Sequence, residues 1–280
     1  MKLAHTLLFM LRENRLVDDL ILARACLKSL EGSAYPTVVV YNQGFWTSAQ
    51  VRAFLALFRL EAHVIGDGVN VGTAAGRQRC FEYIWNHMPE CAYISELHLD
   101  MIFPGNWEEA LTDYLDCHDE PMVCAGIIDG KGAMPFLGKS VPLPEAADAY
   151  DHFLKSLRED RVVHGFTNPC IHACAILKAA GGYDTQFLRG SQCFEDDSML
   201  LGYFYYYGIR HNWYPKVNFN TVVYHAIAGQ RLGMNGDVKI NFDGLVKQYG
   251  TMGLVHLSSL HESQWHQAFF KAQCLKQLSR

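Results

Sequence analysis

The chain has 280 residues, of which 50% are hydrophobic and 19% are charged, a composition that excludes disordered and fibrous proteins. Its 24 basic and 29 acidic residues give a formal net charge of −5, and no basic stripe stands out. This balance argues against a nucleic-acid-binding protein. The 9 cysteines are an odd number spread over a chain that is not small, so we expect reduced thiols rather than a secreted disulfide framework.

The first residues could be mistaken for a leader peptide, because residues 3–11 are mostly apolar. His5 and Thr6 interrupt that run, Arg12 and Glu13 follow it at once, and no small-residue cleavage site comes next. No window of the sequence reaches the roughly 20 apolar residues of a membrane span. We therefore expect a buried first strand, no transmembrane segment and a cytoplasmic protein.

Strand and helix patterns alternate along the N-terminal part of the chain. Strands are predicted at Ala4–Leu11, Thr37–Tyr41, His63–Ile65 and Ala92–Phe103. Helices are predicted at Val17–Leu30, Ser48–Leu60 and Thr73–His87. Such alternation predicts βαβ units and an α/β fold with a mostly parallel sheet, which binds ligands at the carboxyl ends of its strands.

The second half of the chain continues with the same two kinds of element. Helices are predicted at Trp107–Cys117, Glu145–Asp160 and Glu195–Tyr207, and strands at Cys170–Leu177 and Asn218–Ala226. The Gly- and Pro-rich stretch Asp129–Pro144 is expected to be a long surface loop that could cover a substrate. The last fifty residues look helical and follow without a linker. We predict one domain over residues 1–230 and a helical extension over 231–280 packed on it.

One candidate group of chemically useful side chains is Glu96, His98 and Asp100. Side chains alternate along a strand, so these three would share one side of the strand predicted at Ala92–Phe103. A carboxylate at the carboxyl end of a strand suits a divalent cation that bridges phosphates. An edge strand with one polar face would explain the same pattern.

Two further candidates lie later in the sequence. Glu195, Asp196 and Asp197 open a predicted helix, where acidic side chains complement the helix dipole. Three adjacent carboxylates repel one another more than capping requires, which indicates a nearby cation or a catalytic base. His225 follows an apolar strand and is either a metal ligand or an ordinary hydrogen-bonded histidine.

Six short motifs occur in an order and at spacings typical of one enzyme family. They are Asn70–Arg77, Leu99–Trp107, Gly181–Asp184, Phe194–Asp197, Val223–His225 and Lys247–Gly250. Over most of its length the chain resembles the family 2 glycosyltransferases and their relatives of the GT-A fold, which use nucleotide-sugar donors. This resemblance implies a Rossmann-like, mixed but mostly parallel sheet flanked by helices, and glycosyl transfer to an acceptor hydroxyl.

The resemblance also implies roles for individual residues. Asp100 occupies the last position of the family's DxD-type motif and would bind Mn²⁺ or Mg²⁺, with His225 as a second protein ligand and His98 in place of the first acid. Asp196 stands where inverting members keep their general base. The metal ion would stabilise the departing diphosphate as a Lewis acid.

Donor and acceptor contacts follow from the same resemblance. The residues implied on the nucleotide-sugar side are Tyr41, Asn42, Asn70, Gly72, Arg77 and Leu99. The residues implied on the acceptor side are Trp107, Gly182 and Glu195. The expected donor is a nucleotide-sugar, with a UDP-sugar favoured, and the expected acceptor is a glycan or another hydroxyl-bearing molecule.

The chain departs from the family pattern at three places. His98 replaces an Asp, Gln78 replaces a usual Asn, and the turn at residues 41–44 lacks the acid that commonly follows that strand. Because histidine suits Mg²⁺ poorly, the identity of the metal stays open. Two alternatives remain: a degenerate GT-A protein that binds nucleotide or sugar without turnover, and a nucleotidyltransferase of related fold.

Two other kinds of site are weaker alternatives. Cys170, His172 and Cys174 would share a face of the predicted strand Cys170–Leu177 and, with Cys193, could bind zinc, although no second Cys pair of zinc-ligand spacing is present. A serine hydrolase is disfavoured because residues 190–193 lack the second glycine of a nucleophile elbow.

Overall fold

The computed structural model of the protein describes residues 2–208, 212–226 and 238–279. Its strands are β1 Leu3–Phe9, β2 Thr37–Asn42, β3 Glu61–Ile65, β4 Tyr93–Leu97, β5 Met101–Ile102, β6 Met122–Asp129, β7 Ala133–Met134, β8 Lys139–Ser140, β9 Val162–His164, β10 Cys170–Ala173 and β11 Lys216–His225. Its α-helices are α1 Leu16–Leu30, α2 Ser48–Leu55, α3 Thr73–His87, α4 Glu109–Cys117, α5 Tyr150–Ser156, α6 Cys174–Ala180, α7 Glu195–Tyr207, α8 Val238–Leu260 and α9 Gln264–Leu278.

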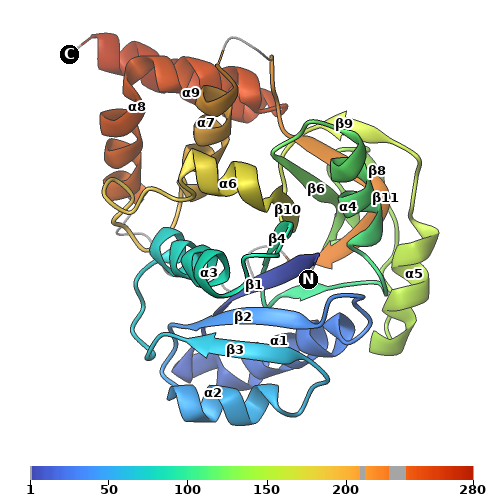
Figure 1. Ribbon diagram of the computed structural model, residues 1–280. Coiled ribbons are helices and arrows are strands. Elements are labelled where there is room, and N and C mark those ends of the chain that lie inside the picture. The colour runs from blue at the N-terminus through green and yellow to red at the C-terminus, as the bar shows by residue number, and fades with distance from the viewer. Residues whose placement is uncertain (1, 209–211, 227–237, 280) are drawn as a thin grey trace.

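A curled sheet runs through the centre of the molecule (Figure 1). Its strand order is β3-β2-β1-β4-β10-β6-β11-β5, and β9 pairs with β11. Strands β3, β2, β1 and β4 are parallel, as the alternating pattern predicts. The second half is mixed, because β10 lies antiparallel between β4 and β6 while β11 runs parallel to β6 and antiparallel to β5.

Each face of the sheet has its own apolar core. In β2, Val38 and Val40 face one core, while Val39 and Tyr41 face the other, as the period of two along a strand requires. Apolar residues of α1, α2 and α4 fill the first core. Those of α3, α6, α7, α8 and α9 fill the second. Burial on both faces explains why the parallel strands are continuous apolar runs rather than alternating ones.

The C-terminal helices α8 and α9 pack on the second face of the sheet together with α7 (Figure 1). Leu254, Leu257 and Phe270 of this helical pair belong to the same buried cluster as Leu201 of α7. The predicted boundary at residue 230 lies outside the described residues, so the division into a domain and an extension stays a prediction.

The strand predicted at Ala92–Phe103 is interrupted, and this corrects one expectation about the site. Strand β4 ends at Leu97, where the buried guanidinium of Arg77 donates to the Leu97 carbonyl and, at 2.8 Å, to the Thr6 carbonyl. The chain then turns through residues 98–100 and pairs again as β5, with β11. Glu96, His98 and Asp100 therefore do not share one face of a strand.

Other boundaries also differ from the prediction. The apolar stretch at Cys170–Leu177 forms β10 only to Ala173 and then becomes helix α6, which ends at Gly181 with φ 94°. The loop Asp129–Pro144 contains the short hairpin β7–β8, and the helix expected at Glu145–Asp160 is shorter. Strand β6, in the middle of the sheet, is not predicted from the sequence.

Over the ranges that the structure describes, no helix combines the length and the apolar character needed to cross a bilayer.

Candidate functional site

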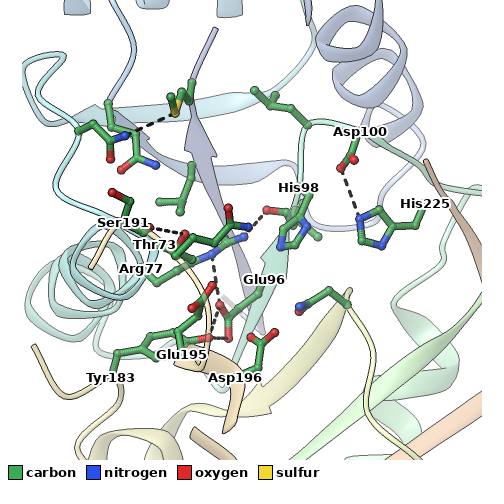
Figure 2. Close-up of a pocket in the computed structure, with 18 of the residues that line it drawn as sticks. Thr73, Arg77, Glu96, His98, Asp100, Tyr183, Ser191, Glu195, Asp196 and His225 are labelled. Carbon is green, nitrogen blue, oxygen red and sulfur yellow. Dashed lines mark hydrogen bonds and ion pairs between the residues drawn. The ribbon is translucent and has the colours of Figure 1, made fainter. Parts of the chain in front are cut away.

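A cleft lies where β1 and β4 end at their carboxyl termini. Figure 2 shows most of the side chains that line it. The lining residues come from several separate parts of the chain: Leu8, Met10 and Arg12 at the end of β1 and just beyond it; Gln43 after β2; Asn70, Thr73 and Arg77 around the start of α3; residues 96–100; and Asn168, Tyr183, Ser191, Gln192, Glu195, Asp196 and His225. The cleft therefore occupies the edge of the sheet at which ligands of parallel α/β proteins bind.

One side of the cleft holds a cluster of His98, Asp100 and His225 (Figure 2). The candidate ligand atoms of these three side chains all lie within 4.8 Å of one another. His225 Nε2 is 3.4 Å from Asp100 Oδ1, and the two imidazole rings meet edge to face with centroids 5.2 Å apart. The cluster forms because β11 brings His225 beside β5, where the Ala226 amide donates to the Asp100 carbonyl.

The donor types of this cluster suit a cation when the imidazoles are neutral. Burial would raise the pKa of Asp100, but the hydrogen bond and charge of His225, together with the charge of His98, outweigh it and hold that pKa below its usual value. An ionised carboxylate and two imidazoles are donors that Mn²⁺ and Zn²⁺ accept in proteins. The three residues therefore fit a divalent metal ion in both donor type and spacing.

The first turn of α7 supplies the carboxylates of another side of the cleft. Glu195 and Asp196 line the cleft, whereas Asp197 accepts a hydrogen bond from His261 Nε2 at 2.7 Å, at the corner between α8 and α9. Glu195 is buried and Asp196 is partly exposed. Of the three adjacent acids, Asp196 is thus the one that combines a position in the cleft with access to solvent.

The floor of the cleft is a buried, hydrogen-bonded network around Glu96. Its carboxylate lies 3.2 Å from Arg77 Nε and 2.8 Å from His172 Nε2, and it accepts hydrogen bonds from the Tyr183 hydroxyl at 2.9 and 3.0 Å. Burial would raise the pKa of Glu96, but the His172 hydrogen bond and charge and the Arg77 charge hold it below its usual value. Arg77 was expected to approach a diphosphate, yet its guanidinium is paired with this carboxylate.

The other end of the cleft reveals a residue that sequence reasoning missed. Gln43 follows β2 directly, is 6% exposed, and its Oε1 atom has no hydrogen-bond partner in the structure. Leu8 and Met10 supply apolar surface nearby in the same cleft, and Asn70 Nδ2 contacts Met10 Sδ at 3.8 Å. Only the position of Gln43 in the sequence could have indicated this role, because the residue directly follows a parallel strand at the ligand-binding edge of the sheet.

Five of the expected site residues do not line the cleft. They are Tyr41, Asn42, Gly72, Trp107 and Gly182. Tyr41 is buried beneath Arg79, and the Asn42 amide donates to the Trp46 carbonyl at 2.8 Å, which holds the turn after β2.

The other three lie outside the cleft. Gly72 begins α3 with φ 85°, and Gly182 with φ 68° lies against Gln78, which accepts the next amide, that of Tyr183. Trp107 is fully buried and stacks on His5 with centroids 5.9 Å apart. The expected residues that do reach the cleft are Asn70, Arg77, His98, Leu99, Asp100, Glu195, Asp196 and His225.

The structure does not bring together the ligands of the zinc alternative, Cys170, His172, Cys174 and Cys193, as a group. Cys174 begins α6 instead of continuing the strand, so it does not share a face with Cys170 and His172. The structure groups Cys170 and His172 with Glu96 instead, and the Cys170 thiol lies 3.2 Å from His172 Nε2. Burial raises the pKa of the Cys170 thiol well above its usual value, as expected for a neutral thiol in a core.

Solved structures of one protein share the fold of this chain. S. aureus TarS superposes with a TM-score of 0.55 at 12% identity, covering 98% of this chain and 43% of TarS. TarS 1-349 in complex with UDP gives 0.57 at 12% identity, covering 98% of this chain and 71% of that one. The same piece in complex with UDP-GlcNAc gives 0.54 at 13% identity, covering 98% and 72%.

These matches show the fold of the chain and how much of the TarS structure the chain spans. No protein-family model and no curated protein sequence matches the chain. The chain spans less than half the length of the full TarS structure. The GT-A fold expected from the sequence motifs, an α/β structure with a mostly parallel sheet flanked by helices, is confirmed.

Proposed function

We propose that the protein is a glycosyltransferase that moves a sugar from a UDP-sugar to a hydroxyl group of an acceptor, with a divalent cation. One observation carries the proposal: a single cleft on a GT-A fold holds the His98–Asp100–His225 cluster and the carboxylate of Asp196. The structures of TarS with UDP and UDP-GlcNAc support this class of donor. The acceptor is a glycan or another hydroxyl-bearing molecule.

The donor would lie along the cleft with its base at the Gln43 end. The Oε1 atom of Gln43 offers an acceptor for a base N–H, and Leu8 and Met10 offer apolar surface for the ring. Asn70 and Thr73, at the start of α3, lie between this end and residues 98–100. Amide groups at a helix N-terminus favour phosphate.

The charges of the cleft support the proposed role of a cation. The arginines that line it are already paired, Arg77 with Glu96 at 3.2 Å and Arg12 with Asp19 at 2.6 Å. A diphosphate would therefore meet mainly carboxylates unless a metal ion were held beside it. Asp100 and His225, with His98, would hold Mn²⁺ there, and the ion would supply Lewis-acid stabilisation of the departing diphosphate.

Asp196 would serve as the general base of an inverting transfer. Its carboxylate, at the first turn of α7, would take the proton of the acceptor hydroxyl as the oxygen attacks the anomeric carbon. The positive end of the helix dipole favours a carboxylate at this position. The partial exposure of Asp196 leaves room for an acceptor to approach from solvent.

The first test is thermal unfolding with UDP, GDP, CDP, dTDP and ADP, each with and without Mn²⁺. A nucleotide at about 100 times its Kd stabilises the fold by about 2.7 kcal/mol, which raises the midpoint by several degrees. We expect a metal-dependent shift with UDP. A flat panel would contradict the proposed donor site.

Asp196→Asn separates catalysis from binding in the same assay. The variant should keep the UDP shift, because Asp196 is not among the metal ligands, and should lose about 100-fold or more of its transfer rate from UDP-sugars. Exposed Asp148 offers a matched control, since Asp148→Asn removes an acid remote from the cleft residues. Equal transfer rates for Asp196→Asn and the unchanged protein would exclude Asp196 as the base.

A further inference from the structure

The loop that leads into α7 has an unusual backbone. Cys193 and Phe194 are consecutive non-glycine residues with φ of 83° and 64°. Side chains disfavour this left-handed region, so such residues persist only where the surroundings hold them. Ser191 and Gln192 of the same loop line the cleft, and Glu195 and Asp196 follow directly. The shape of the loop therefore sets where the carboxylate of Asp196 points.

One buried side chain from the C-terminal helices binds this loop at several points. Asn241 of α8 is 1% exposed, and its Oδ1 accepts the Gly190 amide at 2.6 Å. Its Nδ2 donates to the Cys193 carbonyl at 2.8 Å and the Gln192 carbonyl at 3.3 Å, and approaches the Gly190 carbonyl at 3.5 Å. The polar atoms of one amide are thus all directed at backbone groups of the loop.

The loop is fixed on its other side by the start of α3. The Ser191 carbonyl accepts the Thr73 amide at 2.9 Å and the Thr73 hydroxyl at 3.3 Å. A Cβ atom at Gly72 would lie 2.7 Å from the Gly190 carbonyl oxygen, so the two segments touch through backbone. The loop is therefore held between α3, on the donor side of the cleft, and α8.

Aromatic packing completes the attachment to the C-terminal helices. The ring of Phe194 packs against Phe242 of α8 with centroids 5.2 Å apart, and against Phe269 and Phe270 of α9. These contacts hold the ring, whereas the Asn241 amide holds the backbone. The amide opposes relaxation of the left-handed segment directly, because it binds the carbonyl group of Cys193.

We propose that Asn241 is a positioning residue, which holds the loop of residues 190–194, with its left-handed Cys193 and Phe194, so that Asp196 faces the acceptor. The inference rests on the proposed function, because it gives Asn241 a purpose in glycosyl transfer. It also assigns the helices α8 and α9 a part in the reaction although neither contributes a lining residue to the cleft in the described parts of the chain. Donor binding should depend little on this contact, because the hydrogen bonds of Asn241 go to residues 190, 192 and 193, whereas the nucleotide end of the cleft belongs to β1, β2 and α3.

The test compares Asn241→Ala with Asp243→Ala, an exposed position on the same helix. In the resting protein, hydrogen exchange of the peptide covering residues 188–194 should be about tenfold faster in Asn241→Ala only. The kcat for transfer from a UDP-sugar should fall about 100-fold, as small misplacements of a reacting group do. The KM for the donor and the Kd for UDP with Mn²⁺ should stay within about threefold.

The outcomes separate this inference from the function on which it rests. Unchanged exchange in the loop, or an unchanged kcat, would overturn the inference, as would faster exchange spread evenly over the whole protein. If Asn241→Ala does not fold, Asn241→Asp keeps the acceptor for Gly190 but removes the donors, and the same expectations apply. A wild-type protein that transfers no sugar would overturn the proposed function, while the exchange measurement would still decide whether Asn241 holds the loop.

Discussion

Two clusters of ligand-type side chains lie on either side of the point where β4 ends. Each brings three donor atoms within 4.8 Å of one another: Glu96, Cys170 and His172 in one, and His98, Asp100 and His225 in the other. Their compositions are alike, with a carboxylate and at least one imidazole each. Their surroundings are not, and that difference decides what each can do.

The first cluster is closed. Glu96 is paired with Arg77, and its carboxylate also accepts a hydrogen bond from His172 Nε2. The other ring nitrogen of His172, Nδ1, is hydrogen-bonded to the Tyr203 hydroxyl at 2.8 Å. Every member is buried, and a further hydroxyl, that of Tyr183, also binds the carboxylate. A charge satisfied so fully by the protein has little need of a ligand, and we interpret this cluster as structural.

The second cluster faces the cleft. His98 is partly exposed, the Asp100 carboxylate meets His225 at 3.4 Å, and the side chains of all three line the cavity. The described residues place no arginine or lysine in contact with Asp100, in contrast to Arg77 beside Glu96. Residue type identifies candidate ligands in both clusters. The presence of a buried basic side chain beside the carboxylate, as at Glu96, separates a structural cluster from one that can bind a ligand.

The largest effect we expect is on the closed cluster. Glu96→Gln leaves the guanidinium of Arg77 buried without its countercharge, and breaking such a pair costs about 3–5 kcal/mol. Urea denaturation should show this loss in the free energy of unfolding. UDP binding should persist in whatever fraction stays folded. A variant as stable as the parent would mean that the two clusters do not differ as described.

The next effect concerns the open cluster. Asp100→Ala should lower the affinity for UDP in the presence of Mn²⁺ by about 100-fold, because the removed carboxylate is a proposed metal ligand. The stability of the protein without ligands should change far less than in Glu96→Gln. Calorimetric titration with UDP, with and without Mn²⁺, measures the affinity. Retention of full affinity would remove Asp100 from the metal site.

The effect that is smallest at neutral pH concerns a buried histidine with no carboxylate partner among the described residues. His5 is fully buried, contacts the Ser95 hydroxyl at 2.7 Å and the Ser33 hydroxyl at 3.2 Å, and burial lowers its pKa to about 3. Between that pKa and the unfolded value of 6.5, the unfolded chain binds a proton that the folded chain does not. Stability should therefore rise with pH across this window, by at most about 1.4 kcal/mol per pH unit from this group, and its contribution should be complete above it.

His5→Gln tests this pH dependence. The slope of the unfolding free energy between pH 4 and 6 should flatten in this variant relative to the parent, and should not change in His152→Asn, which alters an exposed histidine. An equal slope in His5→Gln and the parent would show that burial without a countercharge does not govern this group.

The sequence predicted the parallel half of the fold better than the mixed half. The strands and helices from β1 to α3 follow apolar periods that are local, and their expected positions match the structure closely. The end of β4 was missed because the hydrogen bond from Arg77 to the Leu97 carbonyl joins two different elements, and a local apolar period does not show such a contact. The change from β10 to α6 was missed because a short apolar run does not distinguish a strand from a helix.

The candidate site shows the same division between local and non-local information. The resemblance led to Asp100, Asp196 and His225, which the structure brings into one cleft from separate parts of the chain. It could not show that the guanidinium of Arg77 forms an ion pair with Glu96, because a contact between a helix and a strand is not visible in a short sequence motif. Gln43 was not predicted as a site residue because the family pattern has an acid at the turn of residues 41–44.

The position of β11 has a consequence for how the protein is made. Asp100 meets His225 only after β11 has been placed between β6 and β5, and both β6 and β11 leave the ribosome well after the parallel strands β1 to β4. Domains fold from the N-terminal side during synthesis, so the nascent chain can form its parallel strands long before it has His225 to complete the His98–Asp100–His225 cluster. A nascent chain that has not yet reached β11 therefore lacks one of the three proposed metal ligands, and the cleft is completed late in translation.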